Sequence, residues 1–579
     1  MVPRAWLVAC ALVLGALFWG LGDYPLLEPD EGRNVEVARE MARAGDYLLP
    51  HLNGLPYLDK PATYFAAVAA SLAVFGESER AARLPSLLFT LGTIALVWRL
   101  GRSLGAPGTG EIAAVAFATM PLALAFSRTV IFDAALAFLE ALTLFAAWHG
   151  FTAARNTRGW FALAWAAMGV GAITKGPVAI IVPLLIVTAF GFGAGRPLRP
   201  FFSLRAWPWI LVTGLPWFIA VSIRRPDFPA YALVYESLQR VATRSAGRTG
   251  PLWYFVPVLL AGSFPWIGPA IGGAIRAVRL RAHRRESDGW PAAFVASWAL
   301  VPLVFFSLSQ SKLPGYYLPA LPGVALSAAM LLARALQDEG ALRQAARSTT
   351  IVAVVMGVLG VATLVLADVA FVQVQLSPQA RLRLPGVTLG LGAALALGGA
   401  VAFFGARRRL VWVMAAGLAL PVPTTPFVAG RFLEAVARDR SSRDLAASIE
   451  AAAPGARVVG IAAYPTSLRY YLDRPVLLSS RTAAELTSNY IVSRAAEFRG
   501  LPGSPLRPGG WWREALAACA EPTVFVARSG RPAVEELARV LPLIAAGGAD
   551  AKFLAYGPCR PAGAGAGAGA GAPARPGTP

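Results

Sequence analysis

The chain has 579 residues, of which 56% are hydrophobic and 15% are charged, and its mean hydropathy is +0.55. A soluble protein of this length cannot bury so much apolar surface, so the composition excludes a soluble globular protein and indicates a polytopic membrane protein. The formal net charge of +21 does not indicate nucleic-acid binding, because the basic residues are scattered between apolar runs instead of lining one face.

Apolar runs predict the membrane helices. Residues 1–20 combine a basic flank with such a run, and no small-x-small cleavage site follows, so we expect a retained helix and not a cleaved signal peptide. A window of about 20 residues identifies further candidate spans. They lie near residues 84–100, 110–127, 132–149, 159–173, 176–194, 206–222, 251–275, 290–308, 314–333, 349–367, 385–404 and 409–427. The sequence therefore predicts an all-α polytopic membrane protein with about 13 transmembrane helices over residues 1–430.

The arginines of the connecting loops predict the orientation of these helices. Every second connection carries them, and the positive-inside rule places such loops, and the N-terminus, in the cytoplasm. The arginines concerned are Arg99, Arg102, Arg155, Arg158, Arg196, Arg199, Arg205, Arg276, Arg279, Arg281, Arg284, Arg285, Arg334, Arg343, Arg347, Arg407, Arg408 and Arg409. The other connections then face outward, and residues 23–83 form the first periplasmic loop, with interfacial helices.

The chain from residue 431 to residue 560 has a different character. Short β-rich runs such as "RVVGIAAY" and "TVFVARSG" alternate with helix-like segments, a pattern that predicts a small periplasmic α/β domain. Cys519 and Cys559 lie in this domain, and the sequence leaves open whether they pair or remain two free thiols. Residues 561–579 form a low-complexity tail that we expect to be disordered.

A dense acidic stretch follows the first helix. Asp30 and Glu31 come directly after a proline, and the residues after them carry apolar side chains mostly at helical spacing, which predicts an interfacial amphipathic helix. The simplest interpretation is that both carboxylates cap this helix and solvate its loop. The alternative depends on other polar residues predicted at the same membrane face. These are Asp59, Lys60, Arg128, Asp133, Lys175, Glu236, Arg240, Lys312 and Tyr316.

Carboxylates and cations gathered at one membrane surface suit one kind of chemistry. A carboxylate can take a proton from an acceptor hydroxyl, and Lys and Arg side chains can hold a phosphate anion. Together they could displace a phosphate leaving group from a sugar carbon while the lipid tail of the donor stays in the bilayer. We therefore favour a membrane transferase over a transporter or flippase, which would place ionisable residues near the midplane and would commonly show inverted repeats.

Several ordered motifs resemble a known family. They are "PDEGRNVEVAREM", "GDYLLPHLNGLPYLDKP", "FGESERAARLPS", "RTVIFDAAL", "ITKGPVA", "ESLQRV", "GPLWYFVPVLLAGSFPW" and "KLPGYYLPALP". These motifs are similar to those of the polyprenyl-phosphate-sugar-dependent glycosyltransferases of the GT-C fold, and particularly to the bacterial transferases that attach 4-amino-4-deoxy-L-arabinose to lipid A, within the group related to protein O-mannosyltransferases. The resemblance covers residues 1–330 best, and the tail matches that family's periplasmic domain.

The resemblance implies an inverting transfer from a lipid-phosphate-sugar donor and assigns roles to individual residues. Asp30 is implied as the general base or as the group that orients the acceptor. Glu31 and Asp133 are assigned with it to the catalytic acids. The donor phosphate is assigned to Tyr57, Lys60, Arg240, Lys312 and Tyr316, and further substrate contacts are assigned to Arg33, Asp59 and Glu236.

Some positions depart from the family pattern. Asn34 stands where Tyr is common, Asp59 where Glu is common, and Ser237 where a His is expected beside Glu236. Close family members hold a zinc ion with an acidic residue and that His. Because His51 is the only histidine on the predicted outward side, a zinc site is poorly supplied here. We predict no firm cofactor and leave a divalent metal ion open.

Further questions stay open from the sequence alone. Glu140, in the middle of a predicted span, could be functional or simply hydrogen-bonded, and Arg43, Arg80 and Arg83 could bind anionic lipid head groups. The acceptor could be lipid A, a protein or an envelope glycan. The expected partners are an undecaprenyl-phosphate-linked sugar donor, a lipid or glycan acceptor and membrane lipids, without nucleic acid. The expected location is the bacterial inner membrane.

Overall fold

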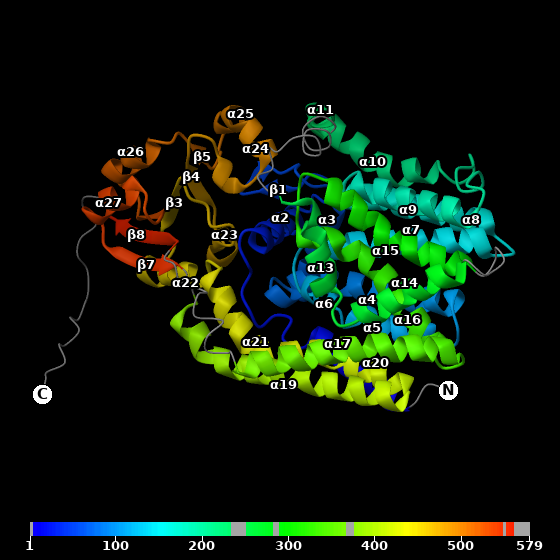
Figure 1. Ribbon diagram of the computed structural model, residues 1–579. Coiled ribbons are helices and arrows are strands. Elements are labelled where there is room, and N and C mark those ends of the chain that lie inside the picture. Colours follow the sequence, from blue (N-terminus) through cyan, green and yellow to red (C-terminus); the bar gives the residue numbers. More distant parts are fainter. Residues whose placement is uncertain (1–3, 233–249, 282–288, 366–375, 548–551, 561–579) are drawn as a thin grey trace, which may run out of the picture. The chain divides into compact units, whose positions relative to one another are not determined.

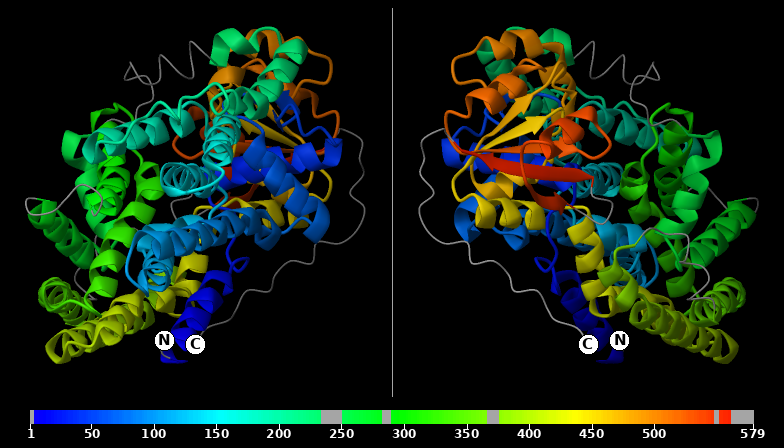
Figure 2. Two further views of the ribbon diagram at one scale, coloured as in Figure 1. Left: turned by 90° about the vertical axis from the view of Figure 1, so that its right-hand side faces the viewer. Right: turned by 90° about the vertical axis from the view of Figure 1, so that its left-hand side faces the viewer.

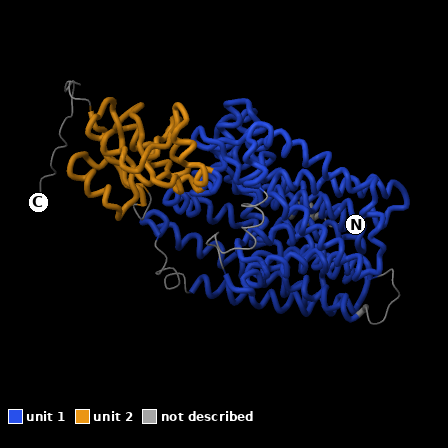
Figure 3. Tube along the Cα trace, turned by 90° about the horizontal axis from the view of Figure 1, so that it is seen from above, with its two compact units in different colours: residues 1–441, 488–490 blue, residues 442–487, 491–579 orange. Residues whose placement is uncertain are grey.

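The computed structural model describes residues 4–232, 250–281, 289–365, 376–547 and 552–560 (Figure 1). The chain divides into two compact units, which Figure 3 shows in different colours. Residues 1–441 together with 488–490 form the first unit, and residues 442–487 together with 491–579 form the second. The first unit is mainly helical, and the second contains a β-sheet.

The helices of the first unit follow one another along the chain. In the N-terminal half they are α1 (Arg4–Phe18), α2 (Asp30–Ala44), α3 (Thr63–Phe75), α4 (Glu79–Leu104), α5 (Thr109–Ala118), α6 (Pro121–Ser127), α7 (Asp133–Thr152), α8 (Thr157–Lys175), α9 (Val178–Ala194), α10 (Trp209–Arg224) and α11 (Phe228–Ala230). The later ones are η3 (Leu252–Tyr254), α13 (Phe255–Gly262), α14 (Ile267–Arg281), α15 (Trp290–Leu308), η5 (Pro314–Ala320), α16 (Leu321–Arg334), α17 (Glu339–Val365), α19 (Pro378–Arg408), α20 (Val411–Ala419) and α21 (Pro421–Asp439).

The protein is a multi-span membrane protein, but the predicted number of spans is not confirmed. Among the described residues, seven helices are long and apolar enough to cross a membrane, or up to nine if each bent pair counts as one span. The bent pairs are α5 with α6, at 65°, and η3–α13 with α14, at 111°. Pro121 and Pro265 lie at these breaks, and proline lacks the N–H that would continue a helix. The breaks do not explain the larger number predicted, because each bent pair corresponds to one predicted span. The predicted spans near residues 1–20, 176–194 and 206–222 correspond to α1, α9 and α10, which have 15, 17 and 16 residues, whereas a span needs about 20.

The first loop contains a helix, α2, where the sequence predicted an interfacial amphipathic helix. Val35, Val37, Ala38 and Met41 are buried, but Asn34, Glu36 and Arg39 are buried as well, so α2 is covered on more than its apolar face. The helix ends at Gly45, whose φ of 66° is left-handed and favours glycine. Beyond it, β1 (His51–Leu52) and β2 (Leu55–Pro56) form an antiparallel hairpin around an Asn-Gly pair with positive φ at both residues. The loop is therefore folded and not a flexible connection.

Large aromatic side chains fill the core of the first unit. One of them holds η5 in position. Trp266 and Trp298 are fully buried, and each indole N–H has a partner. Trp266 donates to the Thr119 hydroxyl at 2.8 Å, and Trp298 donates to the Pro319 carbonyl at 2.7 Å. The second bond ties η5 to α15. Because an unpaired buried N–H is costly, it holds the "KLPGYYLP" segment in one place.

The second unit is built on a six-stranded sheet with the order β5-β4-β3-β6-β8-β7. Strands of this sheet face the viewer in the right-hand view of Figure 2. The strands are β3 (Arg457–Ile461), β4 (Val476–Ser479), β5 (Leu506–Arg507), β6 (Thr523–Arg528), β7 (Leu543–Gly547) and β8 (Phe553–Cys559). β3 is parallel to β4 and β6, and β4 to β5, whereas β8 runs antiparallel to β6 and β7. The predicted α/β character of the tail is confirmed.

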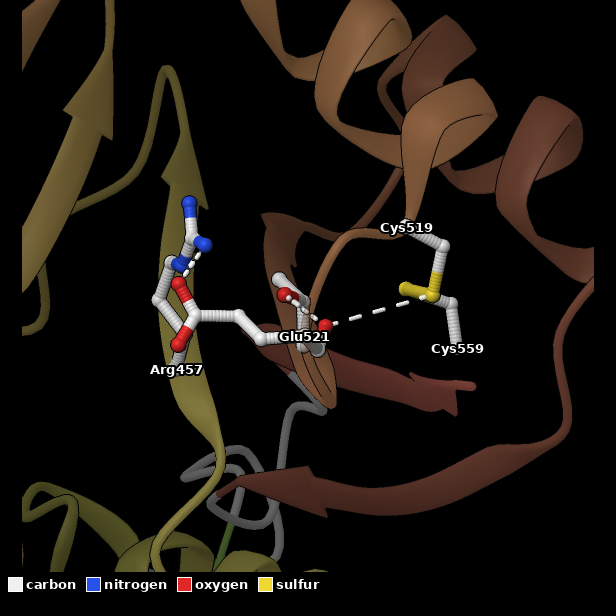
Figure 4. Close-up of a disulfide and its surroundings, with 5 residues drawn as sticks. Arg457, Cys519, Glu521 and Cys559 are labelled. Atoms are coloured by element: carbon white, nitrogen blue, oxygen red, sulfur yellow. Dashed lines mark hydrogen bonds and ion pairs between the residues drawn. A yellow bond between two sulfur atoms is a disulfide. The ribbon is translucent and has the colours of Figure 1, made fainter. Parts of the chain in front are cut away.

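Short helices connect these strands. They are α22 (Arg443–Ala452), α23 (Leu468–Leu472), η6 (Ala484–Leu486), α24 (Asn489–Ser493), α25 (Ala495–Arg499), α26 (Trp511–Ala518) and α27 (Pro532–Ala538). Trp512 of α26 and Leu537 of α27 are buried in one cluster with Phe525 of β6. Figure 4 shows that Cys519 and Cys559 form a disulfide near an ion pair of Arg457 with Glu521. The Cα atoms of the two cysteines are 6.0 Å apart. Of the two alternatives that the sequence left open, a disulfide or two free thiols, the structure contains the disulfide.

Candidate active site

Glu31 is the hub of a buried network in the first loop. Its side chain is 1% exposed, and its two oxygens accept from the Arg83 guanidinium at 3.0 and 2.8 Å. The backbone N–H groups of Leu27 and Val130 also donate to it, at 3.0 and 2.9 Å. A bidentate, fully hydrogen-bonded carboxylate of this kind has no free lone pair for a reacting proton. The geometry therefore argues against the catalytic role predicted for Glu31 and gives it an anchoring role.

Arg83 is equally occupied. It is fully buried and donates to the carbonyls of Leu21, Tyr24 and Pro25 at 3.2, 2.8 and 3.1 Å, besides its bonds to Glu31. The guanidinium also lies 3.8 Å from the centroid of the Tyr24 ring. It ties the chain after α1 to α2 and α4. The suggestion that Arg83 binds lipid head groups is therefore wrong.

The turn between α6 and α7 is held against this network. Asn34 donates its amide N–H to the Val130 carbonyl at 2.8 Å, and the Tyr24 hydroxyl donates to the Arg128 carbonyl at 2.8 Å. Ser86 donates to the Thr129 carbonyl, also at 2.8 Å. Since α7 begins at Asp133, a few residues on, these bonds set the position of that carboxylate relative to α2.

Asp30 contrasts with its neighbour Glu31. Its side chain is 44% exposed and forms an ion pair with Arg33 at 2.5 Å, one helical turn along α2. Burial alone would lower the pKa of the Arg33 guanidinium, but the nearby Tyr57 hydroxyl and the Asp30 and Asp59 carboxylates raise it above its usual value. The Arg33 cation therefore lies in reach of three of the predicted site residues. Of the two neighbouring acids, Asp30 and Glu31, only Asp30 is exposed enough for a substrate to approach.

A second cluster joins three predicted motifs. Asp133, which is buried at the first turn of α7, accepts from the Lys175 ammonium at 2.6 Å. Lys175 ends α8 and lies 5.3 Å from the centroid of the Tyr316 ring of η5. A side chain at Gly315 would place its Cβ 2.6 Å from the nearer Asp133 oxygen, so this contact requires glycine. Lys175 was singled out in the sequence only as a cation of the outer face, and the structure adds it to the site.

Lys312 does not point toward this cluster. It is buried, and its ammonium donates to the carbonyls of Phe306 and Ser307 at 3.0 and 2.5 Å, which caps the end of α15. Burial lowers the pKa of this ammonium. Its predicted contact with the donor phosphate is not supported by this arrangement, in which Lys312 fixes the start of η5.

The "YLDKP" turn contributes a further group of predicted residues. Tyr57 is buried, with its ring edge-to-face against Phe65 at 5.9 Å. Lys60 donates to the backbone carbonyl of Asp59 at 2.8 Å. The Asp59 carboxylate is buried and accepts from the Tyr231 hydroxyl at 2.7 Å and from the Asn489 N–H at 2.9 Å. Asp59 is thus engaged by protein donors. Glu236 and Arg240 lie outside the described residues.

The described residues do not fit the zinc ion of close family members. Among them, no group of three or more His, Cys, Asp or Glu side chains lies close enough to hold a metal. Asp59 has hydrogen-bond donors around its carboxylate instead of further ligands. Zinc in proteins takes three or four His, Cys or carboxylate ligands, and the described residues bring no such set together, so no step of the chemistry is assigned to a metal here.

A separate apolar cavity of about 640 Å³ lies among α14, α15 and α16. Arg276, Arg334 and Trp290 contribute to its lining, and so does Tyr317. None of the predicted site residues lines it. The cavity is therefore distinct from the two polar clusters described above.

The chain is similar in sequence to known glycosyltransferases. A family model described as dolichyl-phosphate-mannose-protein mannosyltransferase matches residues 59–223. An undecaprenyl phosphate-alpha-4-amino-4-deoxy-L-arabinose arabinosyl transferase of Erwinia tasmaniensis is 30% identical over 405 residues, which cover 68% of this chain and 71% of the relative. The enzyme of the same name from Pseudomonas paraeruginosa is 32% identical over 61% of this chain, and the match spans 63% of that relative's length.

Two solved structures extend the likeness along the chain. ArnT from Cupriavidus metallidurans in the apo state has a TM-score of 0.77 at 26% identity, over 95% of this chain and 97% of that one. The same protein bound to undecaprenyl phosphate has a TM-score of 0.78 at 25% identity, over 96% and 98%. With the fold, the ordered motifs and the Erwinia relative in agreement, the chain belongs to the family of undecaprenyl phosphate-alpha-4-amino-4-deoxy-L-arabinose arabinosyl transferases, glycosyltransferases of the GT-C fold.

Proposed function

We propose that the protein is a glycosyltransferase that moves a sugar from a polyprenyl-phosphate donor to an acceptor on the periplasmic side of the bacterial inner membrane. The observation that carries this proposal is the likeness to ArnT bound to undecaprenyl phosphate, which extends over 96% of this chain. The relatives are named for 4-amino-4-deoxy-L-arabinose. We assign that sugar, with lipid A as its acceptor, as the narrow form of the proposal.

The orientation in the membrane is part of the proposal. The arginine-bearing loops would lie in the cytoplasm with the N-terminus, and α2, the 128–133 turn and η5 would lie on the periplasmic side. The first unit would be the catalytic domain and the second a periplasmic domain. The disulfide in the second unit supports this assignment, because disulfides persist in oxidising compartments such as the periplasm.

The proposed reaction is a direct displacement. An acceptor hydroxyl oxygen attacks the anomeric carbon, the bond from that carbon to the phosphate oxygen breaks, and polyprenyl phosphate leaves with the electron pair, so that the configuration inverts. Asp30 takes the proton of the attacking hydroxyl. Its exposure and its ion pair with Arg33 support this role. A positioned base of this kind accelerates proton transfer by roughly 10²–10⁴-fold.

The phosphate leaving group needs positive charge. We assign this to Arg33, Lys60 and Lys175, with Tyr57 and Tyr316 beside them, and we keep Arg240 as a prediction outside the described residues. Asp133 holds Lys175 at 2.6 Å and so positions the cation instead of acting on the acceptor itself. Fixed cations in a site with little water stabilise the charge that develops on the leaving oxygen.

A second acceptor class is supported by a specific observation. The family model that matches residues 59–223 is described by the transfer of mannose to protein. A secreted protein or another envelope glycan is therefore the alternative acceptor, with the same donor chemistry and the same residues.

Mass spectrometry of lipid A and of envelope glycans, from cells with and without the gene, tests the proposal. A lipid A species heavier by one aminopentose only when the gene is present would support the narrow form. Unaltered lipid A with a changed glycan or glycoprotein would support the alternative acceptor. If purified protein mixed with a polyprenyl-phosphate sugar and these acceptors transferred nothing, the proposed activity would be wrong.

A further inference from the structure

Asp59 is a buried carboxylate that accepts four hydrogen bonds. One oxygen accepts from the Tyr231 hydroxyl at 2.7 Å and from the backbone N–H groups of Asn489 and Tyr490 at 2.9 and 3.3 Å. The other oxygen accepts from the Ser488 hydroxyl. The side chain is 7% exposed. A buried anion is costly unless donors surround it, and here two side chains and the first turn of α24 supply them.

These donors come from segments that are far apart in the sequence. Tyr231 lies 172 positions after Asp59 and directly follows α11, and Ser488 lies 429 positions after it. Residues 488–490 nevertheless belong to the first unit, whereas the chain on both sides of them belongs to the second. A three-residue piece of the tail is therefore built into the helical unit, and Asp59 is its binding partner there.

The donor segments are also joined to each other. The Tyr490 hydroxyl donates to the Asp227 carboxylate at 2.7 Å, and the rings of Tyr231 and Tyr490 meet edge-to-face with centroids 5.0 Å apart. Both tyrosines are buried. Because the three segments hold one another, the position of Asp59 depends on all of them. We call the set of Asp59, Asp227, Tyr231, Ser488 and Tyr490 the Asp59 clamp.

We infer that the Asp59 clamp positions the donor-binding turn. Tyr57 and Lys60 flank Asp59 in that turn, and the Lys60 ammonium donates to the Asp59 carbonyl. Fixing the Asp59 carboxylate fixes the backbone that carries both residues. Tyr231, Ser488 and Tyr490 are thus positioning residues. This inference rests on the proposed function in one respect, the assignment of Lys60 and Tyr57 to the donor phosphate.

The clamp also explains why Asp59 itself is not a substrate ligand. A sugar or phosphate group that bound to its carboxylate would have to displace donors that are already placed, and each displaced donor would lose a charge-assisted bond. The role predicted for Asp59 from the sequence is therefore replaced by one that acts through the neighbouring residues.

Two mild variants of the full-length protein test the clamp, Ser488→Ala and Tyr231→Phe, with Ser493→Ala as the matched control. Ser493 is an exposed serine of α24 and is not among the donors to Asp59. Hydrogen–deuterium exchange is measured without substrate on the peptide that contains residues 57–61. We expect several-fold faster exchange in both test variants than in the unchanged protein. In the control variant we expect the exchange rate to stay the same. Unchanged exchange in both test variants would overturn the clamp.

Steady-state kinetics then test the positioning role. We expect the KM for the lipid-linked donor to rise several-fold in Ser488→Ala and Tyr231→Phe, with the KM for the acceptor unchanged. Faster exchange with an unchanged donor KM would overturn the positioning role. Because the exchange experiment needs no substrate, it stays valid if the proposed transferase activity fails, so the two failures are distinguishable.

Discussion

Two adjacent carboxylates at the start of α2 have opposite environments. Glu31 is 1% exposed and is bonded to Arg83 and two backbone N–H groups, whereas the side chain of Asp30 is 44% exposed and is paired with Arg33. Neighbouring helical positions point about 100° apart, so one residue can face the protein and the next the solvent. The sequence groups the two acids together, and only their surroundings distinguish the exposed acid from the buried one.

The Asp30→Asn variant should lose transferase activity by roughly 10²–10⁴-fold, because the amide cannot take the acceptor proton. Its melting temperature should stay near that of the unchanged protein, since Asp30 is partly exposed. Transfer is measured with purified protein, and Asp23→Asn, which changes an exposed carboxylate of the same loop, is the control. Turnover of Asp30→Asn close to that of the control would remove Asp30 from the mechanism.

Glu140 is a third acid with a distinct environment. It lies in the middle of α7, is 1% exposed, and neither of its oxygens has a hydrogen-bond partner in the described part of the chain. The sequence left open whether Glu140 is functional or simply hydrogen-bonded. The hydrogen-bonded role is not observed among the described residues.

Replacement of Glu140 by Leu should raise the melting temperature in detergent, because it removes a buried polar group whose missing bonds cost about 1–3 kcal/mol. Glu140→Gln, which keeps polar atoms at the site, is the matched control and should give less gain. If Glu140→Leu unfolded the protein, the carboxylate would have a stabilising partner. If the Glu140→Leu variant were stable but had lost transferase activity, that result would show that the Glu140 carboxylate has a functional role.

At the level of elements, the site depends on how α2, α4 and the 128–133 turn are joined. The Glu31–Arg83 pair connects the two helices, and Val130 donates to the same carboxylate. Asn34 and Ser86 hold the neighbouring carbonyls of that turn. The turn in turn precedes Asp133, which holds Lys175. The sequence motifs predicted that these segments meet, but not which side chains make the contacts.

Glu31→Ala or Arg83→Ala alone should destabilise the protein by about 3–5 kcal/mol, because each leaves a buried charge unpaired. The double variant should cost less than the sum of the two. Arg43→Ala breaks the exposed pair with Glu77 and should cost only about 0–1 kcal/mol. Thermal unfolding of the purified variants gives these values. Additive losses in the double variant would show that the two charges do not interact.

At the level of the whole molecule, function depends on sidedness. Asp30, the Asp133–Lys175 pair and η5 have to share one face of the membrane for a lipid-linked donor to reach them. The helices of the first unit vary in length and some are bent, so the number of crossings between two loops does not follow from hydropathy alone.

Alkaline phosphatase fusions after residues 62 and 313 should be active, because both loops are predicted to be periplasmic, and a fusion after residue 199 should be inactive because of its arginines. Enzyme activity in intact cells is the measurement, with fusion-protein abundance as the control. Opposite results for residues 62 and 313 would place Asp30 and η5 on different sides and would end the proposed mechanism.

The sequence by itself determined the class of protein, the helix that begins at Asp30, the α/β character of the tail and the family. Each of these rests on a local property, namely hydropathy, the period of apolar residues, or the order of short motifs. Residue types in order along the chain are sufficient for such properties.

Only the tertiary structure decided where helices break, which acid is exposed, and what surrounds Asp59, Lys175 and Lys312. Apart from Leu27, which lies four positions before Glu31, the donors to the Glu31 and Asp59 carboxylates lie between 52 and 431 positions away in the sequence. Whether a carboxylate is buried and hydrogen-bonded or exposed depends on donors from other elements of the fold. The local sequence around the carboxylate does not show which donors these are. The physical reason is that burial and hydrogen bonding are properties of the packed whole, whereas periodicity is a property of the segment.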